Sequence, residues 1–340
     1  ITQIITIGET IGNYFQDLPH VISFANTNAF LQQFNTESFN NETILIKGAR
    51  SFNFDESVVL IEKKVHETVL EINLDALTSN YNFYKQKLKN TTKVMVMVKA
   101  FGYGNGGYEI AKQLAHLKTD YLGVAFADEG IALRKAGITT PIMVLNPEIS
   151  SYKSMIAYNL EPEMYNVSGL TSFIDLAKEK NLNAYPIHLK IDTGMHRLGF
   201  EKEDISELIT LLQHNNFVKV TSIFSHLAAT DNFDFKDFTL QQIQLFESIS
   251  NQIATTLNIQ PIRHILNTSG IFNFSKYQYE MVRLGIGIYG VGNSEEEQSS
   301  LENVSTLKSI ISQIRTVEAN DSIGYSRKFM VKKEMRIATI

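Results

Sequence analysis

The chain has 340 residues, 44% of them hydrophobic, which is enough to bury a core of barrel size and leaves room for more than one domain. Its 31 basic and 36 acidic residues give a net charge of -5 without a basic cluster. This balance argues against nucleic acid as the main partner and favours a small-molecule ligand. Because the chain contains no cysteine, disulfides and thiolate chemistry are excluded.

The two ends of the chain carry information about its origin. There is no leading signal segment and no long apolar stretch, so the sequence predicts a cytoplasmic protein that does not enter a membrane. Residue 1 is isoleucine rather than methionine, and residues 336–340 have the pattern of a strand interior. We therefore expect the chain to be part of a longer polypeptide.

Residues 1–65 do not follow the pattern of the rest of the chain. They contain an amphipathic stretch at Thr27–Phe34, a strand-like run at Thr43–Gly48 and a helical pattern at Glu56–Glu62. This order predicts the end of an α/β domain whose first part is missing.

From Lys93 onward, short β-rich apolar runs alternate with amphipathic stretches, within an expected barrel domain of residues 66–300. The predicted strands are Lys93–Ala100, Tyr121–Ala127, Pro141–Asn146, Glu161–Asn166, Pro186–Asp192, Lys219–Leu227, Ile262–Leu266 and Tyr279–Ile286. The predicted helices are Asp75–Leu88, Tyr108–Leu117, Asp128–Ala136, Leu170–Lys180, Asp204–Gln213 and Phe238–Leu257. Eight such repeats fit a closed (β/α)8 TIM barrel better than an open doubly wound sheet. Since Asp75–Leu88 precedes the first strand, we expect the barrel module to begin near Thr68.

The last part of the chain changes character again. Asn293–Glu302 is polar and acidic, which predicts a linker. Leu307–Thr316 and Met335–Ile340 are strand-like without a helix between them. We expect a second, β-rich domain over residues 301–340.

One segment of the first barrel strand suggests chemistry. The apolar run Val94–Val98 ends on Lys99 and then breaks into a loop with three glycines and Tyr103. A strand that carries an amine to its C-terminal tip can present it to a carbonyl cofactor such as pyridoxal phosphate. The glycines leave free backbone N–H groups for a phosphate. The alternative is an ordinary lysine at a solvated strand end.

Further polar side chains follow the other predicted strands, where a barrel enzyme places its site. They are Lys190, Asp192, Thr193 and Arg197 after strand five, Ser225 and His226 after strand six, Asn267 and Thr268 after strand seven, and Arg283, Gly285 and Ile286 on strand eight. Each also has a purely structural interpretation. Arg197 could form an ion pair at the surface, His226 could be a hydrogen-bonded histidine of the core, and Asn267 and Thr268 could cap the start of a helix. Arg283 lies inside an apolar run, where a buried guanidinium needs a partner or a ligand.

Taken together, these motifs make residues 66–340 resemble alanine racemases of the pyridoxal-phosphate fold-type III group. The similar segments are Val98–Gly104, the highly specific His188–Gly199, Ser225-His226, Asn267-Thr268, Val282–Gly290 and the second-domain motif Ile323-Gly324-Tyr325. They follow one another in the order found in that family.

The resemblance implies an isomerase that interconverts L-alanine and D-alanine on pyridoxal 5'-phosphate, with no metal. Lys99 would hold the cofactor and serve as the base on one face of the substrate. Tyr325, from the partner subunit of a head-to-tail homodimer, would serve the other face. The cofactor would also be bound by Tyr103, Arg197, His226, Asn267, Thr268, Arg283, Gly285 and Ile286, and Arg197 would contact the substrate as well.

Within that set, the resemblance implies a role for each group. Arg283 would face the pyridine nitrogen, with His226 hydrogen-bonded to it, and Arg197 would contact the phenolic oxygen. Tyr103, Thr268 and the backbone of Gly285 and Ile286 would hold the phosphate. Lys190 lies near Arg197 in sequence and would repel it, so carbamylation of Lys190 is a hypothesis, as occurs in some relatives.

The sequence also departs from the family pattern. Phe101 replaces a small polar residue, Asn105 a histidine, Thr268 a serine and Leu284 a proline. Threonine keeps the hydroxyl needed for phosphate binding. The family's next segment, which supplies a phosphate-binding tyrosine and groups for the substrate carboxylate, would lie after residue 340.

The first 65 residues resemble the tail of a Mur ligase. Gly8-Glu9-Thr10 and Leu45–Arg50 are similar to the C-terminal domain of the UDP-N-acetylmuramoyl-tripeptide–D-alanyl-D-alanine ligase, with Glu56 onward as its last helix. The resemblance implies a fused ligase–racemase for peptidoglycan synthesis, whose ligase part would use ATP and Mg outside this chain.

Three alternatives stay open at this point. The chain could be another enzyme of the same barrel group, such as an amino-acid decarboxylase, although that group pairs the pyridine nitrogen with a carboxylate and this sequence has Arg283. It could be a noncatalytic pyridoxal-phosphate carrier with a lone barrel, against which Tyr325 and the second-domain strands argue. It could also be a catalytically silent scaffold for the ligase.

Overall fold

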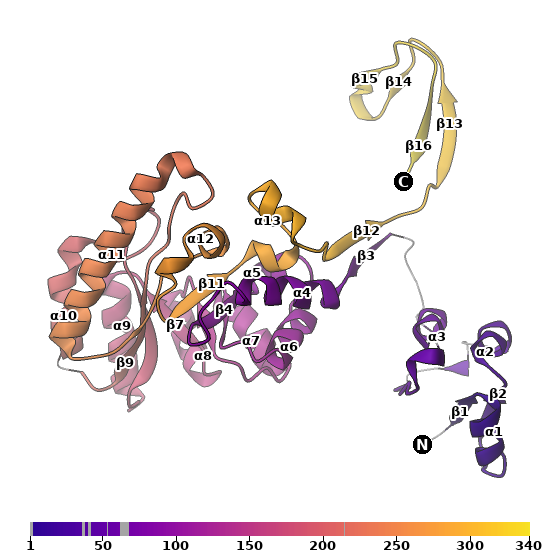
Figure 1. Cartoon of the computed structure of the whole chain (residues 1–340), viewed down its shortest axis with the longest axis horizontal. Coiled ribbons are helices and arrows are strands. Elements are labelled where there is room, and N and C mark those ends of the chain that lie inside the picture. Colours follow the sequence, from indigo (N-terminus) through magenta and orange to yellow (C-terminus); the bar gives the residue numbers. More distant parts are fainter. Residues whose placement is uncertain (1–2, 36–37, 40–41, 53, 62–67, 214) are drawn as a thin grey trace. The chain divides into compact units, whose positions relative to one another are not determined.

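The computed structural model describes residues 3–35, 38–39, 42–52, 54–61, 68–213 and 215–340. The chain divides into two compact units, one of Leu70–Leu307 and one of Ile1–Val69 with Lys308–Ile340 (Figure 1). Each unit is described by itself. The predicted boundary between residues 65 and 66 lies outside the described residues.

The larger unit is a barrel of eight parallel strands. They are β4 (Lys93–Met97), β5 (Tyr121–Val124), β6 (Ile142–Val144), β7 (Glu161–Met164), β8 (Tyr185–Lys190), β9 (Val218–Phe224), β10 (Ile262–His264) and β11 (Met281–Leu284). Each falls within or overlaps a predicted strand. In the sheet, β4 to β10 follow chain order and β11 pairs with β4, while the backbone N–H of Arg283 donates to the carbonyl of Leu266 at 2.9 Å. This last bond joins the end of the β10 segment to β11 and closes the barrel.

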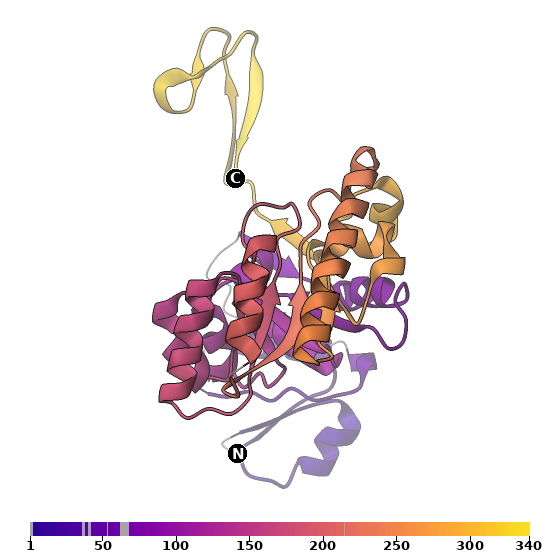
Figure 2. The ribbon, with the colours of Figure 1, turned by 90° about the vertical axis from the view of Figure 1, so that its left-hand side faces the viewer.

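Helices lie outside the strands (Figures 1 and 2). They are α4 (Leu74–Lys85), α5 (Lys99–Tyr103), α6 (Tyr108–His116), α7 (Ala127–Lys135), α8 (Tyr152–Ala157), α9 (Val167–Glu179), α10 (Ile205–Gln213), α11 (Lys236–Leu257), α12 (Thr268–Asn273) and α13 (Glu295–Ser299). The helix predicted at Asp75–Leu88 begins one residue earlier, because the Asn73 side chain caps it by accepting from two backbone N–H groups at 3.0 Å.

The prediction of a linker at Asn293–Glu302 was wrong for its central part. Ser294 caps α13 by accepting from the backbone N–H of Glu297 at 3.1 Å. The Glu297 side chain is buried and accepts from the hydroxyl of Tyr84 on α4 at 2.7 Å. The acidic run is therefore attached to the barrel, which its composition alone does not reveal.

The barrel has two apolar layers on opposite faces of its sheet. The larger layer fills the space between the strands and the surrounding helices. The smaller one contains Met95, Met97, Tyr121, Met143, Phe224 and Met281, which come from five strands and are all buried. Flexible thioether side chains suit such an irregular interior, and burial of each methionine contributes about 1.5–3 kcal/mol.

Residues 3–61 form a small α/β segment of β1 (Ile4–Ile7), α1 (Glu9–Phe15), β2 (Val21–Phe24), α2 (Thr27–Gln33) and α3 (Phe54–Ile61). Strands β1 and β2 are parallel. The amphipathic stretch at Thr27–Phe34 contains α2. The helix predicted at Glu56–Glu62 is also present, although it begins at Phe54 and its predicted end, Glu62, lies outside the described residues.

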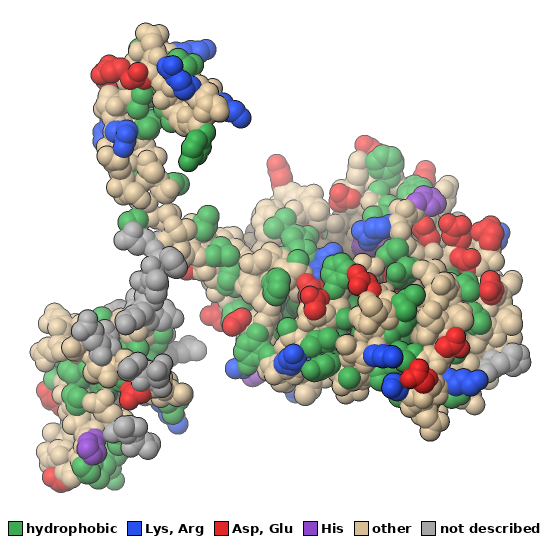
Figure 3. Space-filling model, turned by 180° about the vertical axis from the view of Figure 1, so that it is seen from behind, with side chains coloured by type: hydrophobic (Ala, Val, Ile, Leu, Met, Phe, Trp, Pro, Cys, Tyr) green, Lys and Arg blue, Asp and Glu red, His purple; other side chains and the backbone are tan. Residues whose placement is uncertain are grey.

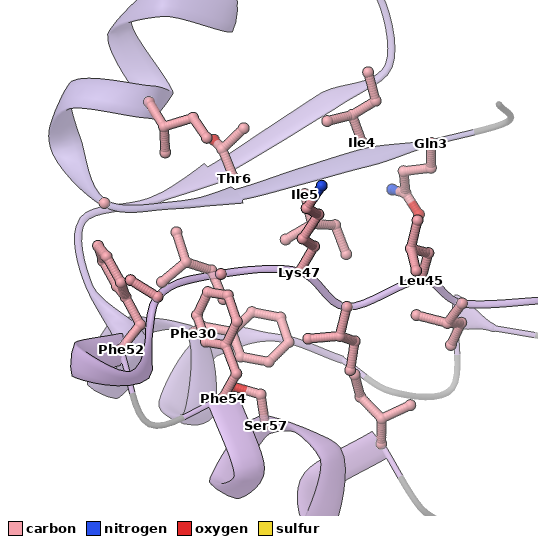
Figure 4. A pocket seen from close by; sticks show the side chains of 18 of the residues that line it. Gln3, Ile4, Ile5, Thr6, Phe30, Leu45, Lys47, Phe52, Phe54 and Ser57 are labelled. Carbon is pink, nitrogen blue, oxygen red and sulfur yellow. The ribbon is translucent and has the colours of Figure 1, made fainter. Parts of the chain in front are cut away.

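The strand predicted at Thr43–Gly48 was wrong. This segment forms no ladder with β1 and instead borders a hollow of about 1430 Å³ beside it. Figure 4 shows Lys47 on this segment opposite Ile5 of β1, and Leu45 opposite Gln3. An apolar run becomes a strand only where a neighbouring backbone completes its hydrogen bonds, and none does so here within the described residues.

Residues 308–340 carry two antiparallel strand pairs. Strand β13 (Gln313–Val317) pairs with β16 (Met335–Thr339), and β14 (Ser322–Ile323) pairs with β15 (Phe329–Met330). At the border of the two units, β3 (Val69–Ile72) pairs with β12 (Ser305–Lys308). The single strand predicted at Leu307–Thr316 is therefore two strands, because its two halves pair with different partners.

Two surface properties complete the description. On the face shown in Figure 3, basic and acidic side chains are interspersed over the larger unit. Within the described residues, no helix combines the length and apolar character needed to cross a membrane.

Candidate active site

Lys99 lies directly after strand β4, where the chain makes an unusual turn. The residues that follow it, Ala100, Phe101, Gly102, Tyr103 and Gly104, all have positive φ angles between 51° and 86°. A left-handed conformation costs a residue other than glycine about 1–2 kcal/mol, so three of the five positions are strained. Such a turn forms only where its surroundings hold it.

The carboxylate of Glu129 on α7 supplies part of that support. Its Oε1 accepts from the backbone N–H of Ala100 at 2.6 Å, and its Oε2 accepts from those of Ala125 and Phe126 at 2.7 and 3.3 Å. One side chain thus ties the residue after Lys99 to the end of β5. Sequence reasoning missed Glu129, because it lies 30 residues from Lys99 and belongs to no motif. A second contact is local: the Asn105 amide donates to the carbonyl of Gly102 at 3.0 Å.

A cavity of about 440 Å³ opens at the C-terminal ends of the strands. It brings together ten of the predicted site residues: Lys99, Tyr103, Lys190, Arg197, His226, Asn267, Thr268, Arg283, Gly285 and Ile286. These residues come from segments spread over nearly 190 positions of the sequence. The Lys99 amine and the Arg283 guanidinium therefore face one cavity.

Arg283 is fixed by a set of acceptors inside the barrel. Its Nη2 donates to the carbonyl of Ser225 at 2.6 Å and to His226 Nδ1 at 3.2 Å, as the resemblance implies for His226. Its Nη1 donates to Nδ1 of His264 at 2.8 Å. Arg283 is 5% exposed, and burial lowers its pKa to about 10, so it stays charged near neutral pH.

The contact with His264 continues through the barrel as a chain of hydrogen bonds. His264 Nε2 lies 2.9 Å from the hydroxyl of Ser222, which lies 2.7 Å from His188 Nδ1. His188 Nε2 lies 2.8 Å from Oε2 of Glu161. His188, Ser222 and His264 are completely buried, so each hydrogen bond satisfies a group that water cannot reach.

Both histidines beside Arg283 are held neutral. Burial, reinforced by the charge of Arg283, lowers the pKa of His226 to about 3 and that of His264 well below its ordinary value. Neutral imidazole leaves one ring nitrogen free as an acceptor, which is what the guanidinium requires.

Hydroxyl and backbone groups of Tyr103, Thr268 and Gly285 also line the cavity. The Thr268 hydroxyl accepts from the backbone N–H of Gly285 at 2.9 Å. A Cβ at Gly285 would lie 3.2 Å from the Tyr103 hydroxyl and 3.5 Å from that of Thr268. Burial raises the pKa of Tyr103, which keeps its hydroxyl protonated as a donor. Asn267 has the capping role considered from the sequence, since its Oδ1 accepts from the backbone N–H of Gly270 at 2.9 Å.

Lys190, which lines the cavity, donates from its ammonium to Oε1 of Glu163 at 3.0 Å. Glu163 is completely buried on β7 and was not among the predicted site residues. The aromatic ring of Phe224, also missed, lies 5.8 Å from the Lys190 nitrogen and 5.1 Å from the guanidinium carbon of Arg283.

Tyr325 is not part of this cavity. It begins the short helix η8 (Tyr325–Arg327) in the smaller unit, and its side chain is 98% exposed. The structure therefore describes it within that unit alone.

The donor groups of the cavity fit pyridoxal 5'-phosphate. Its aldehyde, its pyridine nitrogen and its phosphate need an amine, a donor and a cluster of hydroxyl and N–H groups, respectively. Lys99, Arg283 and the Tyr103–Thr268–Gly285 group provide these at separate places around the cavity. A Cβ at Gly285 would crowd the hydroxyl pair, so glycine keeps that end open.

Comparisons with known proteins agree with this geometry. The family model "Alanine racemase, N-terminal domain" matches residues 72–293, and "Alanine racemase, C-terminal domain" matches residues 304–340. Alanine racemase 1 of Oceanobacillus iheyensis is 33% identical over 275 residues, which cover 80% of this chain and 73% of that protein. Alanine racemase 2 of Bacillus subtilis is 32% identical over 286 residues, covering 82% and 72%.

Solved structures show the same relationship. The alanine racemase of Clostridium difficile 630 superposes with a TM-score of 0.74 at 32% identity, and the match covers 81% of this chain and 73% of that one. Sequence and structure agree over the barrel and the strands after it. This chain belongs to the alanine racemase family.

Proposed function

We propose that the chain interconverts L-alanine and D-alanine with pyridoxal 5'-phosphate as its cofactor. The observation that carries this proposal is the shared cavity of Lys99 and Arg283, which bring an amine and a permanent donor to one space of about 440 Å³. When bound, the cofactor withdraws electrons from the substrate Cα and weakens its bond to hydrogen. The work of the protein is then to orient the cofactor and move one proton.

Two bases are proposed for that proton. The Lys99 amine holds the cofactor and then serves one face of the substrate Cα, because the turn at residues 100–104 fixes it at the end of β4. The Tyr325 phenol of a second copy of this chain serves the other face. Its 98% exposure is compatible with that role, since the side chain is free to enter a partner's cavity.

Arg283 explains why the proton returns. A guanidinium donates a hydrogen bond but does not give up its proton near neutral pH, so it leaves the pyridine nitrogen unprotonated and the ring a weaker electron sink. Fast reprotonation of Cα is then favoured over side reactions such as transamination. This argues against the decarboxylase alternative, which uses a carboxylate at the same place.

The remaining groups bind and orient. Arg197, which lines the cavity, would contact the phenolic oxygen of the cofactor and the substrate carboxylate. His226, kept neutral beside Arg283, fixes the guanidinium, while Asn267 positions Thr268 through the cap of α12. Tyr103, Thr268 and the backbone at Gly285 and Ile286 would hold the phosphate.

Absorbance and isotope exchange test the proposal. We expect the chain, mixed with pyridoxal 5'-phosphate, to develop a visible band that Lys99→Ala abolishes, and to exchange the α-hydrogen of L-alanine with deuterated water. Lys93→Ala is the matched control, because Lys93 lies at the other end of the same strand and is paired with Asp120 at the surface. A bound cofactor without exchange would instead support the silent scaffold.

We further propose the domain arrangement expected from the sequence: 1–65 as the end of a Mur ligase C-terminal domain, 66–300 as the barrel and 301–340 as the start of the second domain. The parallel β1–β2 pair with α1 and α2 is compatible with an α/β ligase domain. D-alanine made by the barrel would supply the dipeptide that such a ligase uses. Reading the coding sequence ahead of residue 1 tests this, since ligase motifs for ATP and Mg must be found there.

A further inference from the structure

The ion pair of Lys190 and Glu163 borders a cavity lined by positive charge. Lys99, Lys190, Arg197 and Arg283 all line the cavity, and none of its described lining residues is an aspartate or glutamate. Glu163 does not line it. Its carboxylate lies on the neighbouring strand, completely buried, and accepts from the Lys190 ammonium at 3.0 Å.

Lys190 depends on this carboxylate for its charge. Burial lowers the pKa of Lys190, and the charges of Arg197 and Arg283 lower it further, whereas Glu163 opposes them. An ammonium buried beside two guanidinium groups is expected to lose its proton unless an anion is close. Glu163 is the carboxylate that the structure places there.

Burying the Glu163 carboxylate is energetically unfavourable. Burial raises the pKa of Glu163, whereas the positive charges of Lys190, Arg283 and Arg197 act in the opposite direction and favour its ionised form. Its second oxygen, Oε2, is buried and accepts no hydrogen bond from the described residues. A carboxylate that served packing alone would be replaced without loss by an apolar side chain of similar size.

We propose that Glu163 is a positioning residue, a built-in counter-charge that keeps Lys190 as an unmodified ammonium in the cavity that Arg197 also lines. It supplies from the protein the negative charge that carbamylation of Lys190 would otherwise supply. In carbamylation, the lone pair of a neutral amine attacks carbon dioxide, an N–C bond forms as one C=O π bond opens onto oxygen to give a carboxylate, and the nitrogen loses one proton to solvent. An ammonium has no lone pair, so the pair with Glu163 prevents this step.

The modification state can be measured without cofactor or turnover. The whole chain is equilibrated with ¹³C-bicarbonate near neutral pH, and its carbon NMR spectrum is compared with that of Lys190→Met. We expect the two spectra to agree: the wild-type chain should show no carbamate signal that is missing from the Lys190→Met spectrum. A signal lost in Lys190→Met would overturn the proposal.

The charge state of Lys190 is the second measurement. With ¹⁵N-labelled lysine, the Lys190 resonance, assigned by its loss in Lys190→Met, is followed as a function of pH. Glu163→Gln is expected to lower the pH at which Lys190 deprotonates by more than about one unit, because the opposing anion is gone. An unchanged titration would show that Glu163 does not hold the ammonium.

Thermal unfolding separates the pair from general damage to the core. Glu163→Gln should lower the unfolding midpoint by roughly 5 °C or more, and adding Lys190→Met should restore most of that loss, because a buried pair is harmful chiefly when one partner is left alone. The matched control is Glu161→Gln, two residues earlier on β7 and bound to His188. The fall in unfolding midpoint caused by Glu161→Gln should not be restored by adding Lys190→Met. Equal behaviour of the two variants would contradict the proposal, and failure of the racemase assay would not affect this result.

Discussion

The Arg283 guanidinium lies 2.8 Å from Nδ1 of His264, and this contact sets the direction of every hydrogen bond behind it. Because a guanidinium can only donate, Nδ1 of His264 accepts and its Nε2–H must donate to Ser222. The Ser222 hydroxyl is then left to donate to His188, whose remaining N–H donates to Glu161. This series of hydrogen bonds has a permanent donor, Arg283, at one end and a carboxylate, Glu161, at the other. One arrangement of its protons therefore gives every group in the series a hydrogen-bond partner.

Replacing His226 by asparagine should make the barrel less sensitive to acid. With a folded pKa of about 3 against an unfolded value of about 6.5, His226 binds a proton only in the unfolded state between these limits, so the free energy of unfolding falls as the pH drops. His226→Asn keeps an acceptor for Arg283 and removes the contribution of His226 to the pH dependence of the free energy of unfolding. That contribution is at most about 1.4 kcal/mol per pH unit. Urea unfolding at several pH values below 6.5 measures the slope, and an unchanged slope would refute the assignment.

Glu129→Gln should loosen the turn that carries Lys99. Glutamine offers one acceptor oxygen to three backbone N–H groups and turns an NH₂ toward the others, which costs about 1–3 kcal/mol. We expect slower formation of the visible band when pyridoxal 5'-phosphate is added, followed by stopped-flow absorbance. The neighbouring, exposed Asp128 is the control, and Asp128→Asn should form the band at the wild-type rate. Equal rates in both variants would mean that Glu129 does not position the lysine.

Gly285→Ala should weaken cofactor binding. The new Cβ would lie 3.2 Å from the Tyr103 hydroxyl, closer than an ordinary contact, and would displace the group proposed to hold the phosphate. We expect the dissociation constant for pyridoxal 5'-phosphate to rise about tenfold, equivalent to about 1.4 kcal/mol. Gly137→Ala is a control in which φ is +89° and no atom lies within 4 Å of the new Cβ. It should lower stability and leave the dissociation constant unchanged.

Tyr325→Phe should impair racemisation unequally in the two directions. If the phenol removes the proton from L-alanine, then its loss slows exchange from L-alanine more than exchange from D-alanine, which uses Lys99. Single-turnover exchange in deuterated water with each enantiomer measures both directions. Equal slowing would contradict the assignment of Tyr325 to that face of the substrate.

The sequence predicts the barrel well because its signals are local. Each strand is an apolar run with its own turn residues, and Lys99 and Arg283 can be assigned to strand ends without knowing their neighbours. The supporting groups follow from pairings between distant strands or loops. Glu163 becomes a partner of Lys190 only through the β7–β8 register, and Glu129 reaches Ala100 only once α7 packs beside the turn. The residues at 43–48 show the opposite case, in which a local strand pattern lacks a partner.

The closure of the barrel has a consequence for the order of assembly. The backbone N–H of Arg283 donates to the carbonyl of Leu266, and Arg283 on β11 pairs with Met95 of β4. The last barrel strand to be synthesised therefore pairs with the first barrel strand. Contacts of such long sequence separation form late in folding. A nascent chain that ends before residue 281 therefore carries Lys99 on an incomplete sheet. Arg283 joins it only when β11 is added and the barrel closes.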